Sequence, residues 1–396
     1  MASRTRGGSP GRSDRAGTFR RVSAGGETYF VFYPRPLPPE PPLEVEPLQD
    51  LADRANQALG RLDGVTLLLP SPDLFLYSYV RKEAVLSAQI EGTQSSLSEL
   101  LLFEHEDAPG VPKPEIAEPL NYVRALYHGL HRIEGGFPLS NRLLREIHAL
   151  LVEGGRGADK APGEFRTSQN WIGGTRPGNA RFVPPPPEEI ALAMSDLEKF
   201  LHDRPVQTPI LFKAALAHAQ FGTIHPFLDG NGRLGRLLVT LLLCAEQRVL
   251  SKPLLYLSLY LKRNRDEYYE RLQRVRTDGE WEEWVRFFLE GVSDVANSAT
   301  DATRRLLALI ERDRQRIQSL GRAAASAARL HELVVREIVF KIPEAARRLE
   351  TNEVTLGNAA RNLESLGIVR ETTGRPRNKR YVYVDYLAVI EEGTAE

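Results

Sequence analysis

The sequence predicts a mainly helical protein, in which a helical bundle carrying one β-hairpin precedes a C-terminal winged helix-turn-helix domain. Through most of residues 114–291, apolar residues recur at three- and four-residue spacing, as they do on the buried face of amphipathic helices. Residues 163–184 interrupt this pattern with two short β-like pieces around a Gly/Pro-rich turn, which predicts a projecting hairpin. After residue 320, three predicted helices and a strand are followed by the turn TGRPRNK and another strand, the order of a winged helix.

Composition limits the class of protein. A chain of 396 residues is too long for one small core, so two or three domains are expected. Its 52 Lys and Arg residues balance its 52 Asp and Glu residues, so a nucleic-acid or membrane partner would need a local charged patch. The one cysteine, Cys244, excludes an intrachain disulfide and a cysteine-based metal site. No apolar run is long enough to span a membrane, and residues 1–21 lack a secretory signal, so a cytoplasmic protein is expected.

The sequence divides into four expected regions. Residues 1–25 are expected to form a flexible basic tail, and residues 26–113 an N-terminal helical region. The latter begins with a short aromatic strand and a Pro-rich segment, for which a strap across the domain is favoured over a polyproline ligand. Residues 114–291 are expected to form the core, and residues 292–396 a linker helix with the winged helix.

The stretch HPFLDGNGRLGR, residues 225–236, forms a corner between two predicted helices. The start of the second helix leaves backbone N–H groups unpaired, and such a helix terminus attracts anions. Gly230 and Gly232 have no side chains, so phosphate oxygens can approach the backbone there. Arg233 and Arg236, three residues apart on one helix face, can reach consecutive phosphates. The corner is not a P-loop, because the GxxxxGK[ST] pattern is absent.

Two residues beside this corner add chemistry to it. Asp229 supplies a carboxylate, and one carboxylate with phosphate oxygens is a common way of holding Mg²⁺. His225 titrates near neutral pH and is suited to act as a general base. A plain glycine-rich turn with surface arginines is the alternative, and the fixed offsets of all these residues count against it. The stretch therefore predicts a polyphosphate site with a metal carboxylate and a base.

These twelve residues match the signature HxFx[D/E]GNGRxxR without departure, so the chain resembles the Fic family, most members of which transfer AMP from ATP to a hydroxyl of a target protein. The resemblance implies that residues 114–291 are the Fic core and that residues 75–100 are its N-terminal extension. It implies that His225 deprotonates the target hydroxyl, that Asp229 binds Mg²⁺ and that Phe227 anchors the loop. The ATP-binding residues then include Gly230, Asn231, Gly232, Arg233, Leu234, Gly235 and Arg236, with Arg236 serving the γ-phosphate.

The resemblance extends to three further points. Both motif glycines are present, which favours AMP transfer over the kinase activity of members with bulkier loop residues. The predicted hairpin corresponds to the family's flap, which pairs with a target segment by strand addition. The stretch LYLKRNRDEYY resembles the nucleoside pocket, which would place Tyr260 and Asn264 near the adenine. Core packing is the equally favoured interpretation of Tyr260.

A second motif, SAQIEG at residues 87–92, suggests a built-in inhibitor. Ser87 and Glu91 share one helix face, and Glu91 lies at a helix end where its negative charge opposes the helix dipole. An ordinary exposed glutamate would be the plain interpretation. The stretch matches the family's inhibitory motif [S/T]xxxE[G/N], which implies that Glu91 pairs with Arg236 and takes it from the γ-phosphate. Whether the same glutamate supports AMP removal stays open.

The C-terminal region carries a local basic patch. Within residues 361–380, two acidic residues oppose Arg361, Arg370, Arg375, Arg377, Lys379 and Arg380. DNA is therefore an expected alternative partner, beside a protein–protein or dimerisation role. Three functions remain in view: a self-inhibited enzyme that transfers AMP to a Ser, Thr or Tyr hydroxyl of a target protein or of itself, a DNA-binding regulator with the Fic core as nucleotide sensor, and transfer of another nucleotide-linked group. A homodimer stays open, and no membrane partner is expected.

Overall fold

The structure, a computed structural model, describes residues 13–66, 72–94, 96–105, 113–246, 249–374 and 379–394. Its helices are α1 (Gln49–Thr66), α2 (Pro72–Ile90), α3 (Leu97–His105), α4 (Lys113–Glu134), α5 (Asn141–Leu151), α6 (Pro187–Leu201), α7 (Ile210–Ile224), α8 (Asn231–Leu241), α9 (Ser258–Arg263), α10 (Arg265–Asp278), α11 (Trp281–Gln318), α12 (Ala324–Glu337), α13 (Ile342–Arg348), α14 (Glu353–Ser365) and α15 (Val384–Glu391). Its strands are β1 (Gly17–Ala24), β2 (Glu27–Pro34), β3 (Val339–Lys341), β4 (Val369–Glu371) and β5 (Arg380–Tyr383). The expected mainly helical fold is thereby confirmed.

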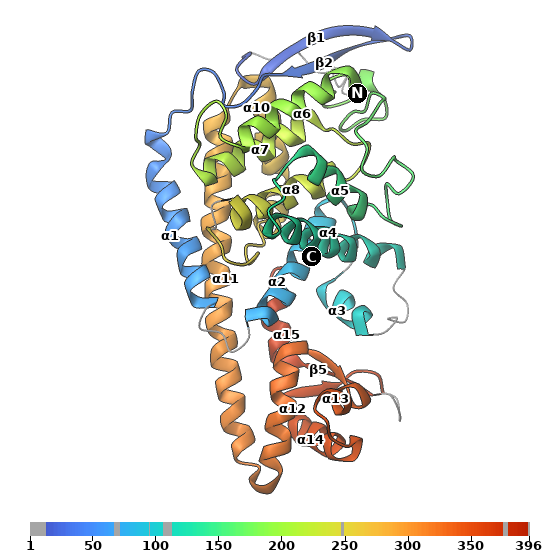
Figure 1. The fold of residues 1–396 in the computed structure, drawn as a ribbon, viewed down its shortest axis with the longest axis vertical. Helices are drawn as coiled ribbons and strands as arrows, with labels where there is room; N and C mark the ends of the chain where they lie inside the picture. The colour runs from blue at the N-terminus through green and yellow to red at the C-terminus, as the bar shows by residue number, and fades with distance from the viewer. Residues whose placement is uncertain are drawn as a thin grey trace, which may run out of the picture.

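The helix α7 lies at the centre of the bundle. Its sequence is apolar on almost every side, and all but one of its residues are buried, as expected of a helix surrounded by other helices. Its one lysine, Lys213, is fully buried and pairs with Asp203 at 2.9 Å. The helices α8, α6 and α11 pack against α7, and α1 runs along the outside of α11 (Figure 1). The motif corner between α7 and α8 is therefore held in the rigid centre of the molecule.

The last fifth of the chain, from α12 onward, forms a small module below the bundle (Figure 1). Helices α12, α13 and α14 pack against an antiparallel sheet of order β3-β5-β4, and β4 and β5 are the two expected strands. The strand β3 between α12 and α13 was not expected, because residues 339–340 fall within the first predicted helix. The expected linker helix, however, is not separate. It begins at Trp281 and runs for 38 residues as α11, so the boundary expected at residues 291/292 falls inside a helix. Gly291 stands at this boundary but does not end the helix, because it is buried inside α11 where the Tyr260 ring packs against it.

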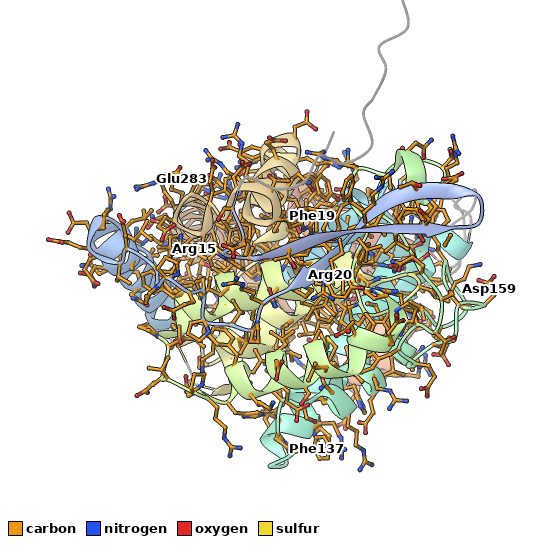
Figure 2. The ribbon with its side chains drawn as sticks, turned by 90° about the horizontal axis from the view of Figure 1, so that it is seen from above. Arg15, Phe19, Arg20, Phe137, Asp159 and Glu283 are labelled. Carbon is orange, nitrogen blue, oxygen red and sulfur yellow. The ribbon has the colours of Figure 1, made fainter. Side chains whose placement is uncertain are left out.

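The N-terminal region differs from the expected flexible tail, because residues 17–24 form β1. This strand pairs antiparallel with β2, and the Phe19 and Phe32 rings meet at 4.8 Å. The hairpin lies across the top of the helices, with Phe19 and Arg20 on the strand and Arg15 just before it (Figure 2). The Arg15 guanidinium donates to both carboxylate oxygens of Glu282, each at 2.7 Å, and so fixes the hairpin to the start of α11. The basic composition of this segment hid its alternating strand pattern.

The hairpin expected over residues 163–184 is reduced to one bridge, between Ile172 and Phe182. Gly173 and Gly174 adopt positive φ angles and a short 3-10 turn spans Pro177–Asn179, so the backbone leaves the extended conformation after one pair. The Phe32 N–H of β2 donates to the Val183 carbonyl of this segment at 3.0 Å. The strand β2 therefore lies beside this segment. Among the described residues, no helix combines the length and apolar character that a membrane span requires.

Candidate active site

The motif corner is fixed by its own asparagine. The Asn231 amide oxygen accepts from the Phe227 N–H at 3.0 Å, and its amide nitrogen donates to the Phe227 carbonyl at 2.8 Å. The helix α7 ends at Ile224, and the next residue, His225, has left-handed backbone angles; α8 begins after Gly230, which is also left-handed. Because Asn231 spends both amide groups on the loop, its side chain shapes the corner and leaves the N–H groups of α8 to a ligand.

His225 is held with one ring nitrogen available. Its Nδ1 lies 3.3 Å from the Gly222 carbonyl, which can only accept, so Nδ1 carries the proton and Nε2 keeps a lone pair. Burial, followed by the nearby charges of Arg276 and Arg166, lowers the pKa of His225 to about 4. At neutral pH the ring is therefore uncharged. This is the form that a general base requires.

The two motif arginines lie at the start of α8 and are almost fully buried, with exposures of 1% for Arg233 and 3% for Arg236. Among the residues that the structure describes, Arg233 Nε and Nη1 and Arg236 Nη1 donate no hydrogen bond. Such buried donors are costly unless an anion takes them. Arg233 Nη1 also lies 3.3 Å from Glu118, which compensates part of its charge. The two arginines therefore bring buried positive charge and unsatisfied donors to the start of α8, as the predicted phosphate site requires.

Asp229 lies at the edge of this site and is partly exposed. Its Oδ1 accepts from the Gly230 N–H at 2.6 Å and lies 3.5 Å from Arg233 Nη2 and 3.9 Å from Arg156 Nε. Within the described part of the chain, no cluster of three or more metal-ligating side chains occurs. One carboxylate with phosphate oxygens needs no such cluster, so the residues present fit a Mg²⁺ that arrives with the nucleotide.

Glu91 and Ser87, at the end of α2, contact Arg236. Arg236 Nη2 donates to Glu91 Oε1 at 2.8 Å and to the Ser87 carbonyl at 2.9 Å, while its Nε donates to Ser87 Oγ at 2.8 Å. Burial alone would raise the pKa of Glu91, but the charge and hydrogen bond of Arg236 hold it below its ordinary value. An alanine Cβ at Gly232 would lie 2.1 Å from Glu91 Oε1. The glycine is therefore what lets this carboxylate approach α8.

Other residues predicted from the sequence lie away from this cluster. Leu234 is fully buried, and the Gly235 carbonyl accepts from His218, so both belong to the packing of α8 on α7. The Tyr260 ring contacts Phe287 on α11 at 5.0 Å. Asn264 precedes α10 and donates back to the Tyr260 carbonyl at 3.0 Å. On α10, burial raises the pKa of the Tyr268 and Tyr269 hydroxyls, and the charges of Arg236 and Glu91 act on both: Arg236 lowers the pKa of each and Glu91 raises it.

Several residues that build the site were not predicted from the sequence. Arg166 donates to the His225 carbonyl through Nε at 2.9 Å, and its own N–H donates to the Pro226 carbonyl at 2.9 Å. Arg156 donates to the Glu91 carbonyl at 3.1 Å, so its positive charge offsets the negative end of the α2 dipole. His148 stacks on Phe227 at 3.8 Å. A histidine on the apolar face of a strongly amphipathic helix was the available signal for His148; the two arginines had none.

Comparison with known proteins agrees with this geometry. The Fic/DOC family N-terminal model matches residues 49–131, and the Fic/DOC family model matches residues 138–243. Proteins named "Protein adenylyltransferase Fic" are similar over about a third of the chain: 37% identity over 131 residues in Drosophila erecta and 36% over 130 residues in Aedes aegypti. These matches cover 32% of this chain and 23% of each relative, so the chain spans about a quarter of their length.

A solved structure extends the likeness of the fold. The crystal structure of a Fic family protein from Desulfovibrio desulfuricans superposes with a TM-score of 0.56 at 20% sequence identity, covering 89% of this chain and 98% of that one. The similarity therefore includes regions beyond the catalytic motif. Residues 49–131 and 138–243, which the two family models match, are therefore similar to the Fic/DOC family both in sequence and in the geometry of the site, with its motif corner and its Glu91–Arg236 contact.

Proposed function

We propose that this protein transfers AMP from ATP to a hydroxyl side chain of a target protein or of itself. The observation that carries the proposal is the meeting of a neutral His225, whose Nε2 is available, with the start of α8 and its two buried arginines. A base and an anion site that lie together suit attack by a hydroxyl on a phosphate. The curated relatives are named for this activity, which supports the proposal.

In the proposed step, His225 Nε2 takes the proton of the Ser, Thr or Tyr hydroxyl as its oxygen attacks the α-phosphorus. The bond from the α-phosphorus to the bridging oxygen breaks, and pyrophosphate leaves. The N–H groups of α8 and the Arg233 and Arg236 guanidiniums balance the phosphate charges, since fixed donors need no reorganisation during the reaction. Arg166 holds the His225 carbonyl and so keeps the base in place.

Mg²⁺ belongs to the proposal through Asp229. Its carboxylate, together with phosphate oxygens, would hold the ion, which supplies neutralisation of the leaving pyrophosphate. The other residues implied by the family resemblance, Tyr260 and Asn264 at the adenine, stay predictions. So do the division into domains at residues 26–113, 114–291 and 292–396, and a cytoplasmic location.

The contact between α2 and α8 supports autoinhibition. Glu91 takes one donor of Arg236 and Ser87 takes two more contacts, so a γ-phosphate must compete with them for the same guanidinium. Nη1 of Arg236 donates no hydrogen bond among the described residues. A phosphate could therefore still contact this nitrogen, so the nucleotide would bind without being held in its reactive position. The proposal is that ATP binds the inhibited protein in an unproductive pose.

Two variants and two radiolabels test the proposed reaction. With α-labelled ATP, Glu91→Gly is expected to label itself or a lysate protein strongly, and Glu91→Gly/His225→Ala to label nothing. With γ-labelled ATP, no variant is expected to become labelled, because pyrophosphate leaves. Labelling by the γ-phosphate would indicate a kinase, and equal α-labelling with and without His225 would overturn its role as base. Competition by unlabelled CDP- and UDP-linked donors tests whether another nucleotide group is transferred.

DNA binding is the second candidate, supported by the layout of the C-terminal module. Three helices and a three-stranded antiparallel sheet fit a winged helix, and Arg361, Arg370 and Lys379 are exposed. Arg380, however, is 5% exposed and is not part of a surface patch, while Arg375 and Arg377 lie outside the described residues. DNA shifts that weaken steeply with salt and survive His225→Ala would favour this function. A homodimer stays a prediction.

A further inference from the structure

His148 lies directly beneath the motif loop. It belongs to α5 and is 1% exposed. Its ring stacks on Phe227 with a centroid distance of 3.8 Å and an interplanar angle of 8°. Its Nε2 lies 3.0 Å from the Asp229 carbonyl, and its Nδ1 lies 2.9 Å from the Gly163 nitrogen. One imidazole thus contacts the motif loop at two residues and also the segment before the bridge.

These contacts select one form of the ring. The Gly163 N–H can only donate, so Nδ1 of His148 must accept. Nε2 then carries the proton and donates to the Asp229 carbonyl. No other tautomer satisfies both partners. The ring therefore connects residue 163 to residue 229 with defined polarity at each end, and a side chain with one polar atom cannot replace it.

The Asp229 and Gly230 backbone depends on this support. Gly230 has φ +77°, and a Cβ there would lie 3.0 Å from Val152 Cγ1 and 3.3 Å from His148 Nε2. The Asp229 carboxylate accepts from the Gly230 N–H, so the direction of the carboxylate follows the backbone at these two residues. A tilt of the Asp229 peptide would therefore turn the carboxylate away from the phosphate site.

We propose that His148 is a positioning residue, which orients the Asp229 carboxylate toward the cation that accompanies the nucleotide. This inference rests on the proposed function. His148 touches neither ATP nor the hydroxyl in this role. It acts on the reaction through the Asp229 carbonyl, in the way that residues behind a metal ligand fix its orientation.

The test compares three variants in the Glu91→Gly background. His148→Phe keeps a ring stacked on Phe227 and removes both hydrogen bonds. Asp229→Asn is the positive control, and His331→Phe, a buried histidine of the C-terminal module that contacts Tyr383, controls for the general cost of losing such a residue. Binding of a fluorescent ATP analogue is titrated with Mg²⁺, and AMP transfer is measured in parallel.

His148→Phe is expected to raise the half-saturating Mg²⁺ concentration for nucleotide binding by about 10- to 100-fold, with Mg²⁺-free binding unchanged. His331→Phe should change neither. A lower melting temperature with an unchanged Mg²⁺ requirement would overturn the positioning role and leave a structural one. If the Mg²⁺ requirement shifts but the Glu91→Gly parent transfers no AMP, the proposed function fails and the positioning of Asp229 stands.

A separate observation concerns the opposite face of α2. Beyond α15, residues 391–394 return to this helix: Lys82 Nζ donates to the Glu392 carbonyl at 2.7 Å and Gln89 to the Thr394 carbonyl at 3.4 Å. The Glu392 carboxylate accepts a hydrogen bond from each terminal nitrogen of Arg305, at 2.8 and 2.5 Å. Figure 1 shows α15 beside α2. Lys82 and Gln89 are seven residues apart and share one face of α2.

The helix α2 is therefore held from two sides. On the face of Ser87 and Glu91, Arg236 binds it, and the buried Glu83 accepts from the Ser258 N–H and hydroxyl at 3.0 and 2.6 Å. On the other face, residues 391–394 bind it. Because the second set belongs to the C-terminal module, a change in the position of α15 is transmitted to the helix that carries Glu91.

We infer that residues 391–394 stabilise the inhibitory position of α2, so that the C-terminal module regulates AMP transfer. This, too, rests on the proposed function. Lys82→Met/Arg305→Met removes two of the contacts while keeping the aliphatic stems. Arg304→Met is the matched control, since Arg304 neighbours Arg305 on α11 and pairs only with Asp301 among the described residues.

Lys82→Met/Arg305→Met is expected to speed amide hydrogen exchange of residues 83–91 about tenfold, as the loss of one to two net hydrogen bonds would, and to raise AMP transfer. Arg304→Met should do neither. If Glu91→Gly activates transfer while the double variant changes neither exchange nor transfer, the regulatory role is wrong. If exchange speeds up but Glu91→Gly itself transfers no AMP, only the proposed function fails.

Discussion

Replacement of Gly232 by alanine gives the sharpest test of the contact between α2 and α8. A Cβ at this position would lie 2.1 Å from Glu91 Oε1 and 3.0 Å from Glu91 Cδ. The obstructing atom is the end of a flexible, 26% exposed side chain, so the carboxylate is expected to swing out and leave Arg236. Gly232→Ala should thus break the ion pair without changing any charge.

The expected magnitude has two opposed parts. Losing a hydrogen bond to a charged group costs about 1.5–3 kcal/mol. Alanine in place of glycine within a helix stabilises by about 0.5–1 kcal/mol. In the wild type, Gly232→Ala should therefore lower the free energy of unfolding by about 1–2 kcal/mol. In a Glu91→Gly background, where no carboxylate obstructs the methyl group, the same change should raise it by about 0.5–1 kcal/mol.

The assay is urea unfolding followed by tryptophan fluorescence, with all four proteins of the cycle. The coupling should reach about 2 kcal/mol, with the 3.2 Å approach to Arg236 Nη1 common to both backgrounds. Gly357→Ala is the control, because a Cβ there meets nothing within 4 Å and should act alike in both. A Gly232→Ala effect of the same sign and size in both backgrounds would refute the reasoning.

Further predictions concern the loop, pH and the C-terminal module. Asn231→Ala removes two loop hydrogen bonds and should cost about 2 kcal/mol in urea unfolding. Burial lowers the pKa of His218 and of His331 to about 4, so each stabilises the fold fully above pH 6.5 and should contribute a loss of about 2 kcal/mol by pH 5, measured by unfolding at each pH. Asp313→Asn weakens the bond from the Tyr383 hydroxyl and should lower the melting temperature of the module by several degrees in calorimetry.

The sequence was informative where one short stretch carries several functional groups. His225, Asp229 and the arginines of α8 lie within twelve residues, so local spacing was enough to place them together. The contact of Glu91 with Arg236 spans 145 residues, and the family resemblance, not spacing, predicted it. The structure contains the expected pair, in which Arg236 Nη2 donates to Glu91 Oε1 at 2.8 Å.

Residues that act through long-range packing were out of reach. His148 joins Asp229 across 81 residues, and Arg166 joins His225 across 59, with no local pattern that marks either. The strand β1 was missed because its charges resemble those of a tail. Its pairing partner and the Arg15–Glu282 bond, 267 residues apart, decide its conformation. Local composition cannot report such partners.

The uninterrupted helix α11 has a consequence for how a target would be chosen. With 38 residues it is about 57 Å long, and it belongs both to the bundle around His225 and to the C-terminal module. The length of α11 sets how far the module lies from the bundle. If the module binds a macromolecule, only hydroxyls at one corresponding distance from the bound segment would reach His225. Selection of the modified residue would then depend on that distance and not on the surrounding sequence.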